Sequence, residues 1–588
     1  MVQNFTLKRE FTVAQKFFVE YFLELLHNET LDSYRARLHN PYTILEELAK
    51  VVNDRQNNRI KTDITVQYVA EEVRDAIRDE NELTFQSVPK SYLLSLIEKC
   101  GKKDGDYPAI TFALQRIISE NTDYTAKLFA CIQNQLTALN QQPEPQLQDF
   151  GTLYRLINCL VTALISQGYA KDYLFRFASN NFGVRNKYTF TQAYDRLRSL
   201  SNKAQTTFRV VFRWQHQLPL QIPINYLLTE AQYHQFKLIN SRAEEFLTRY
   251  YTKGFEYICL VEQALDYFAA LKQATIRLSG ILDQIYLGFD APEINLHDQA
   301  LVLGELNPAN TRAYPIRGSV EGHYRSGQDI YSEFVQKLAQ IAANTTISPE
   351  TKRKVTSAVR YLRLGIEAFD WEQKFLSFWI GLEYIFSEYD NSESTIVRLK
   401  TNLINSHAVV YMKRNIKELH EDIKRLKLDS AIPNYNSDLN YLKNPDTYET
   451  IIAEARERNP LLAYRTYKFK ERLFDQKEGT KKYLQYHKDN LNRHLTRIYR
   501  VRNEIVHQAG TQQPSINTLV GNLRYYLTFM LNGLMGFLLN NPVDANMDGQ
   551  VSIDDYFILQ QLQLNVIEYG KYKLDDLLSV DNPMEVFY

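Results

Sequence analysis

The chain has 588 residues, enough for about three or four domains, and 44% of them are apolar, so it can bury sizeable cores. Its 69 Lys and Arg residues equal its 69 Asp and Glu residues, which excludes a global positive field that would attract nucleic acid. Any affinity for nucleic acid must therefore come from a local patch.

Three features bear on the compartment. The four cysteines are widely spaced and form neither a metal-ligand pattern nor a disulfide framework: Cys100, Cys131, Cys159 and Cys259. This pattern fits a reducing cytoplasm. The amino terminus lacks the apolar core of a signal peptide. The most apolar segment, Tyr525–Leu539, contains Asn532 and is too short to span a bilayer, so it predicts a buried helix. We expect a cytoplasmic protein that does not contact the membrane.

Residues 1–200 have the apolar spacing of helices, as in Phe17–Leu25, Tyr92–Leu96 and Leu153–Leu164. They predict a helical amino-terminal domain, and nothing in them indicates its role. In residues 201–320 the spacing of the apolar residues changes from that of helices to one that includes strands. This spacing predicts a small α+β module. Its elements are strands at Phe208–Trp214, Phe255–Leu260 and Ala300–Leu303 and a helix at Glu262–Tyr286.

Aromatic residues alternate along the first strand of this module, at Phe208, Phe212 and Trp214. Half-buried strands show this alternation by default, so we expect core packing. The alternative is a sheet face on which RNA bases stack.

A loop at Pro308–Gln328 marks the next boundary, and residues 325–540 predict a helical bundle. Its expected helices are Ile330–Ala343, Lys352–Ile366, Trp371–Phe386, a basic pair across 396–428, Lys481–His507, and a last helix from Pro514 to about Leu539. The overall expectation is a mainly α, multidomain protein with a carboxy-terminal extension at 541–588.

The Lys481–His507 helix holds the most informative feature. One apolar stripe is formed by Leu491, Leu495, Ile498, Ile505 and Ala509. Arg502 falls in a gap of this stripe, while Asn503 and His507 are four residues apart and share a row. An arginine at a core position needs a partner or a ligand, because an unpaired buried charge is expensive.

These residue types suit cleavage of RNA without a metal. An imidazole such as His507 can move a proton near neutral pH, and the Arg502 guanidinium can stabilise charge on phosphate oxygens while the ribose 2′-hydroxyl attacks. Asn503 can hold the phosphate or the imidazole. The alternative is structural: Arg502 caps carbonyls or pairs with a glutamate, and His507 is a helix-end histidine favoured by the helix dipole.

Other Arg/His pairs with similar spacing occur in different contexts: Arg209 and His216 in a predicted strand, Arg317 and His323 in a loop, and Arg414 and His420 in a helix. The apolar stripe of that helix leaves Arg414 on the predicted solvent face. Among these arginines, only Arg502 intrudes on an apolar stripe.

The run Ile498–Gly510 resembles the Arg-Asn-x-x-Val-His signature, closely followed by Gly, of HEPN domains, specifically the ApeA-like branch. Trp371–Phe386 resembles that family's first core helix, which ends in an aliphatic-Glu step at Glu383. The resemblance covers about residues 350–540. It implies a helical bundle that dimerises, or forms a larger oligomer, and brings two motifs into one cleft.

The same resemblance implies a metal-independent endoribonuclease of antiviral or toxin type. Arg502, Asn503 and His507 would carry the chemistry, with Glu383 in support and no catalytic cofactor. Some HEPN domains lack activity, so the rival reading is a non-catalytic subunit that binds RNA or protein.

A run of basic residues leads into the motif, and we expect it to follow RNA phosphates. Its members nearest the motif or at the start of the helix are Arg493, Arg497, Arg500, Lys481 and Lys482. The expected partner is RNA, with tRNA as one candidate. The alternative for such a run is a solvated helix face.

Residues 544–555 resemble the calcium loop of EF-hand and dockerin modules. The expected oxygen ligands are Asp544, Asn546, Asp548, the backbone of Gln550, and Asp555. A single loop with Asp at its last position predicts a structural Ca²⁺ rather than a switch. The alternatives are an Asp/Asn-rich turn that caps the helix Ser552–Leu564, and a calcium-dependent adhesion or scaffold module.

Overall fold

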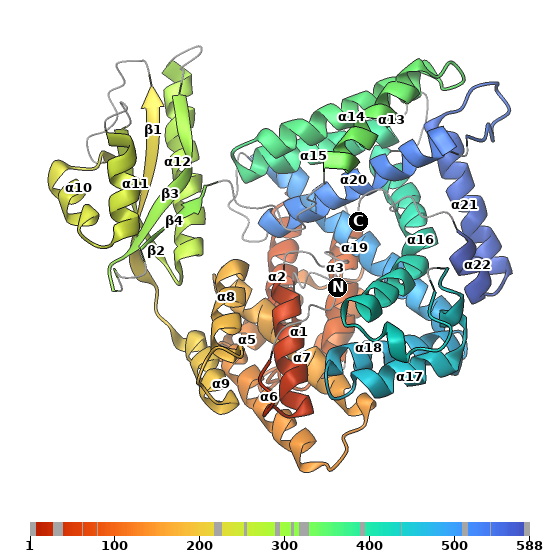
Figure 1. Cartoon of the computed structure of the whole chain (residues 1–588), viewed down its shortest axis with the longest axis horizontal. Coiled ribbons are helices and arrows are strands. Elements are labelled where there is room, and N and C mark those ends of the chain that lie inside the picture. The colour runs from red at the N-terminus through yellow and green to blue at the C-terminus, as the bar shows by residue number, and fades with distance from the viewer. Residues whose placement is uncertain are drawn as a thin grey trace.

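The computed structural model describes residues 7–27, 39–60, 63–78, 80–216, 226–251, 256–288, 294–306, 308, 311–316, 328–387, 394–436, 438–508, 516–540 and 542–580. The protein is mainly α and multidomain, with one small sheet at the side of a large helical body (Figure 1). This confirms the predicted fold class. Within these ranges, no helix combines the length and the apolar character needed to cross a bilayer.

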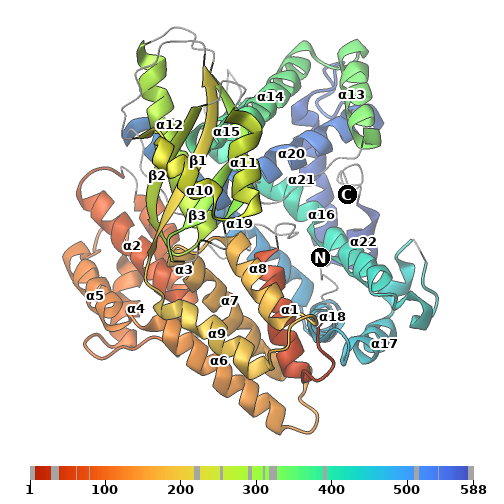
Figure 2. The ribbon, with the colours of Figure 1, turned by 60° about the vertical axis from the view of Figure 1, so that its left-hand side comes forward.

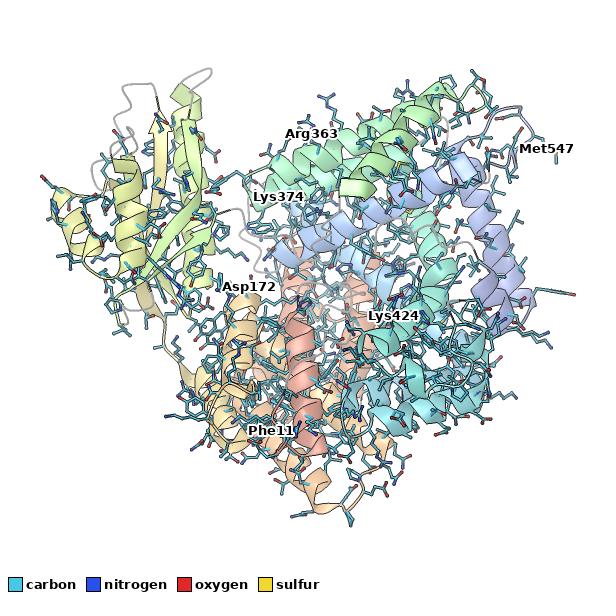
Figure 3. The ribbon with its side chains drawn as sticks, viewed as in Figure 1. Phe11, Asp172, Arg363, Lys374, Lys424 and Met547 are labelled. Carbon is cyan, nitrogen blue, oxygen red and sulfur yellow. The ribbon has the colours of Figure 1, made fainter. Side chains whose placement is uncertain are left out.

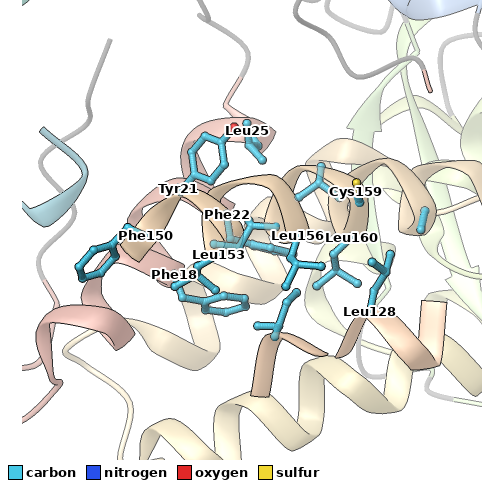
Figure 4. Close-up of a cluster of buried hydrophobic side chains, with 14 of the residues drawn as sticks. Phe18, Tyr21, Phe22, Leu25, Leu128, Phe150, Leu153, Leu156, Cys159 and Leu160 are labelled. Carbon is cyan, nitrogen blue, oxygen red and sulfur yellow. The ribbon is translucent and has the colours of Figure 1, made fainter. Parts of the chain in front are cut away.

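The amino-terminal part is helical, as predicted. Its helices are α1 (Val13–Leu26), α2 (Pro41–Gln56), α3 (Asp63–Arg78), α4 (Lys90–Lys99), α5 (Tyr107–Glu120), α6 (Tyr124–Gln141), α7 (Phe150–Ser166), α8 (Lys171–Phe182) and α9 (Phe190–Arg198). Thr12 begins α1 with a capping box, in which its hydroxyl accepts from the Gln15 N–H. Apolar side chains of α1, α6 and α7 meet in one cluster, among them Phe18, Leu128 and Leu153 (Figure 4).

Two later helices share this amino-terminal core: α17 (Pro445–Ala455) and α18 (Pro460–Lys470). The rings of Phe17 and Tyr464 lie 5.5 Å apart, and the Leu461 N–H donates to Glu20 at 3.1 Å. The amino-terminal core therefore takes in part of the predicted 325–540 bundle. Periodicity identifies the apolar face of a helix, but not the helix against which that face packs.

The middle module is an antiparallel sheet in the order β2-β1-β3-β4, formed by β1 (Thr206–His216), β2 (Glu256–Ala264), β3 (Ile294–Gly304) and β4 (Arg312–Pro315). The sheet lies between α12 (Tyr267–Gly288) and the pair α10 (Glu230–Lys237) and α11 (Ser241–Tyr251) (Figures 1 and 2).

The aromatic residues of β1 face the α12 side of this sheet. Phe208, Phe212 and Trp214 are buried in the core that α12 covers, which confirms their predicted core role. Strand β4 falls within the predicted loop.

The carboxy-terminal half forms a second large core. Its helices are α13 (Gln328–Ala343), α14 (Pro349–Glu367), α15 (Trp371–Phe386), α16 (Thr395–Arg425), α19 (Gly479–Gln508), α20 (Ile516–Asn540), α21 (Ile553–Tyr569) and α22 (Leu574–Ser579). α20 is the predicted buried helix. The predicted helix pair across 396–428 is wrong, because α16 is one continuous helix, and no Gly or Pro interrupts its sequence.

Close packing fixes α15 between α14 and α20. A Cβ at Gly365 would lie 2.4 Å from Phe378 Cε1, and one at Gly381 would lie 2.8 Å from Leu527 Cδ2. Both glycines therefore allow helix axes to approach more closely than a larger residue would. Lys374, which is labelled in Figure 3, adds a polar contact by donating to the Gly365 carbonyl at 3.4 Å. The close approach at Gly381 lies two residues before Glu383, so this part of α15 packs tightly against α20.

Candidate active site on α19

The apolar stripe predicted for the motif helix is present. Leu491, Leu495, Ile498 and Ile505 are buried, and α19 packs against α15 and α16. Ala509, the last predicted member, lies outside the described residues. The register of the helix around the motif is therefore the one that the sequence indicates.

Arg502 lies at the edge of this stripe rather than inside the core. Its side chain is 26% exposed, and its Nη2 lies 3.8 Å from Oε1 of Glu383, whose side chain is 29% exposed. Its Nη1 donates to Asn503 Oδ1 at 3.2 Å. Its Nε is buried and has no hydrogen-bond partner among the described residues. The expectation of an inward-pointing arginine is thus only half met.

This geometry leaves Arg502 with capacity for an anion. A separation of 3.8 Å is an ion pair without a hydrogen bond, so Glu383 attracts the guanidinium without occupying its donors. A half-exposed guanidinium with free donors can grip a phosphate through two parallel hydrogen bonds. The structure therefore brings Arg502, Asn503 and Glu383 together at a position that solvent reaches.

His507 is in the last turn of α19, and its side chain lies outside the described residues. Positions 503 and 507 are four apart on a continuous helix, so they share one face. Val506, beside it, is 46% exposed. The role of His507 remains a prediction.

The three arginines that precede the motif are paired with carboxylates of the amino-terminal helices. Arg497 Nη2 lies 2.8 Å from Glu47 and 2.7 Å from Glu72, and its side chain is 7% exposed. Arg493 contacts Asp75 at 2.6 Å, and Arg500 also contacts Glu47.

In this conformation, carboxylates occupy the guanidinium groups of Arg493, Arg497 and Arg500. These groups therefore cannot contact RNA phosphates as predicted. Their partners lie more than 400 residues earlier in the chain, so no local pattern could identify them.

Electrostatics keeps this interface charged. Burial would raise the pKa of Glu47, but Arg497 and Arg500, with a contribution from His39, hold it well below its usual range. Burial likewise opposes the charge on Arg497, yet Glu47 and Glu72 raise the pKa of its guanidinium. The group is a buried charge network in which Arg497 pairs with Glu47 and Glu72, while the buried Nε and Nη1 of Arg500 make no hydrogen bond to the described residues.

Lys481 and Lys482 are exposed at the other end of α19. Lys481 lies 3.7 Å from Glu478. About 30 Å of helix separates these lysines from Arg502, at the standard rise per residue. The predicted basic residues therefore do not converge on one exposed surface.

The Arg414/His420 pair was predicted to put Arg414 on the solvent face, and this prediction is wrong. Arg414 is 4% exposed, and its Nη1 lies 3.2 Å from His407 Nε2. His420 belongs to a different group, with Nδ1 at 2.8 Å from the Tyr441 hydroxyl. Arg414 is buried because α16 is covered on more than one side, so its polar face is also buried.

The remaining Arg/His pairs do not form a second candidate active site among the described residues. Arg209 is on β1, as predicted, and its Nη2 lies 3.0 Å from Glu305. Arg317 and His323 lie outside the described residues.

Glu47, Glu72 and Asp75, the partners of the α19 arginines, were not predicted from the sequence. A signal existed for Glu47 alone. It lies between Ile44 and Val51 on the apolar face of α2, where a buried carboxylate needs a cation.

The 544–555 loop closes on itself. Asp555 accepts the N–H groups of Ala545 and Asn546 at 2.9 Å each, the Ser552 N–H at 2.7 Å and the Ser552 hydroxyl at 2.8 Å. Asp544 accepts the N–H groups of Asp548 and Gly549. The exposed Met547 marks the tip of the loop at the molecular edge (Figure 3).

This hydrogen-bonding accounts for the loop without a cation. Ser552 is the N-cap of α21, as the capping alternative expects, and Gly549 takes the left-handed φ of +87° that the turn requires. A cation bound to both oxygens of Asp555 would compete with four hydrogen-bond donors, two on each oxygen. In the described part of the chain, no group of three or more His, Cys, Asp or Glu side chains is placed to hold a metal ion. The calcium site remains a prediction.

Comparison with models of known protein families, with curated proteins and with solved structures finds no match to this chain.

Proposed function

We propose that the protein is a metal-independent endoribonuclease of the HEPN type, acting in the cytoplasm in antiviral or toxin-like defence. The observation that supports this most is the meeting of Arg502, Asn503 and Glu383 at a half-exposed position. The Nη2 of Arg502 keeps its donors for a ligand, because its 3.8 Å separation from Glu383 is too long for a hydrogen bond.

Each residue has a distinct task in the proposed reaction. The ribose 2′-hydroxyl attacks the adjacent phosphorus, the bond to the 5′-oxygen breaks, and a 2′,3′-cyclic phosphate forms. His507 moves the proton, and Arg502 stabilises the developing charge on the phosphate oxygens. Asn503 orients one of these partners. Glu383 is a positioning residue, since it attracts Arg502 at 3.8 Å.

The test is incubation of the purified protein with total cellular RNA in the presence of EDTA, followed by mapping of the new ends. The proposal predicts ends that bear 2′,3′-cyclic phosphate, and loss of cleavage in His507→Ala. A matched control is His234→Ala, which removes an exposed histidine of α10. Cleavage that EDTA abolishes, or that survives His507→Ala, contradicts the proposal.

One observation favours the rival function, a non-catalytic subunit that binds RNA or protein. The basic residues of α19 nearest the motif are already paired with Glu47, Glu72 and Asp75. The rival predicts that the protein binds RNA or a partner and leaves every RNA intact, including tRNA. A dimer through the bundle, which the enzyme reading expects, is tested by sedimentation of the wild-type protein.

A further inference from the structure

The contact between α2, α3 and α19 is dominated by charge. Arg493, Arg497, Arg500 and Glu504 follow one another at spacings of four, three and four, so they form one face of α19. Each of them contacts a charged side chain of α2 or α3. On either side of this contact lie the two large apolar cores.

The contact is dry at its centre and wet at its rim. Arg497 and Glu47 are 7% and 6% exposed. Towards the rim, the side chain of Glu72 is 25% exposed and that of Asp75 is 39% exposed. Salt and competing anions screen partly exposed pairs, so the rim can exchange partners more readily than an apolar interface could.

Lys400 of α16 belongs to the same covered face. Its Nζ donates to the Thr496 hydroxyl at 2.5 Å and lies 4.9 Å from the centre of the Tyr68 ring on α3. Burial lowers the pKa of Lys400 to about 8. Removing α3 would therefore return this lysine to water and favour its charged form.

The covered arginines hold their carboxylates as an arginine holds phosphate. Arg497 donates to Glu47 from both Nε, at 3.0 Å, and Nη2, at 2.8 Å, which is the two-pronged geometry that also recognises phosphate. Arg500 follows on the same face, and so does position 507, seven residues after Arg500, whereas Arg502 lies on the opposite side of the helix. A strand bound along this face would therefore reach the proposed site from the side of position 507.

We propose that Glu47, Glu72 and Asp75 form an acidic cover on the basic face of α19, and that phosphates of an RNA strand take the place of these carboxylates when α2 and α3 move away. This regulation rests on the proposed function, because it restricts RNA access to the face of α19 that leads to position 507 of the proposed site. The covered protein is then the restrained form.

The test removes the charge of the partly exposed members. Glu72→Gln and Asp75→Asn are combined in one chain, in a His507→Ala background that prevents cleavage. A matched control combines Glu71→Gln and Glu98→Gln, which remove two charges from exposed positions of α3 and α4. Binding of a short fluorescein-labelled single-stranded RNA is followed by polarisation at several salt concentrations.

The proposal predicts that the cover variant binds at least about fivefold more tightly than the control, and that its salt slope steepens by about 1.4 as two phosphate contacts are gained. Equal affinity and equal slope in the cover variant and the control overturn it. Glu47→Gln is a poorer choice because it leaves the buried Arg497 without its main partner and can unfold the chain.

A charge swap tests the movement itself. Asp75→Arg should increase hydrogen exchange in α2 and α3, and adding Arg493→Asp should restore protection by pairing the two charges in reverse. If hydrogen exchange in α2 and α3 is the same in Asp75→Arg as in the wild-type protein, the proposed acidic cover is wrong.

The outcomes separate the two proposals. If the wild-type protein cleaves RNA but the cover variant binds no better than the control, the cover fails and the nuclease stands. If the cover variant binds RNA more tightly but neither protein cleaves it when His507 is present, the cover stands and the nuclease fails.

Discussion

Two helices of the carboxy-terminal half carry an Arg-Asn pair followed by a histidine, and they place it in opposite surroundings. In α16, Arg414 is buried against His407, and His420 faces a separate aromatic group. In α19, Arg502 is half-exposed beside Asn503 and Glu383. The same residue order thus lies in the core in one helix and at a partly exposed position in the other. Exposure of the guanidinium distinguishes them better than spacing does.

The largest expected effect comes from Arg502→Ala. Loss of a donor that stabilises transition-state charge should reduce cleavage by about 100- to 1,000-fold. Because the side chain is partly exposed, the free energy of unfolding should change by no more than about 0.5 kcal/mol. Initial cleavage rates and thermal unfolding of the same preparation check both. A large loss of stability would make Arg502 a structural residue like Arg414.

Arg414→Ala should have the reverse effect. Removing a buried arginine leaves a cavity and disturbs the His407 contact, so we expect a loss of about 3 kcal/mol in the free energy of unfolding. The cleavage rate of the folded protein should remain within a few-fold of wild type. Urea denaturation measures the free energy of unfolding, and single-turnover cleavage measures the rate of the folded protein. If Arg414→Ala removed cleavage without destabilising the fold, the assignment of the site to α19 would be wrong.

His494 offers a contrast within α19 itself. Burial, together with Arg497, lowers its pKa to about 3, and its ring contacts the Tyr526 hydroxyl at 2.9 Å. Since the folded pKa lies below the unfolded value of about 6.5, the unfolded chain binds more protons between these values, and stability falls as the pH decreases below 6.5.

The corresponding test uses His494→Gln. Between pH 6.5 and pH 5, the wild-type protein should lose about 1.6 kcal/mol more stability than this variant. Urea denaturation at the two pH values gives the difference. An identical loss in both proteins would mean that His494 is not held neutral by the fold.

The smallest effect concerns the 544–555 loop. Asp555→Ala removes an acceptor of four hydrogen bonds and part of the capping box of α21, so it should lower stability by about 1–2 kcal/mol without added calcium. Thermal unfolding with EDTA and with Ca²⁺ provides the measurement. If Asp555→Ala matters only when Ca²⁺ is present, the loop is a cation site, as its sequence predicts.

Local patterns predicted the local structure well. The α19 stripe, the buried α20 and the core role of the β1 aromatics all follow from periodicity and composition. Periodicity could not predict contacts between distant segments. Arg497 meets Glu47 across 450 residues, and α18 joins the amino-terminal core, because both depend on which surfaces meet in space. The burial of Arg414 was missed for the same reason.

The most direct test of the central claim uses an RNA that carries a single 2′-deoxyribose at a mapped cleavage position. In EDTA, the wild-type protein should cleave the all-ribose strand and leave the substituted position intact, since no 2′-hydroxyl is present to attack. Equal cleavage of the two strands at that position would contradict the account.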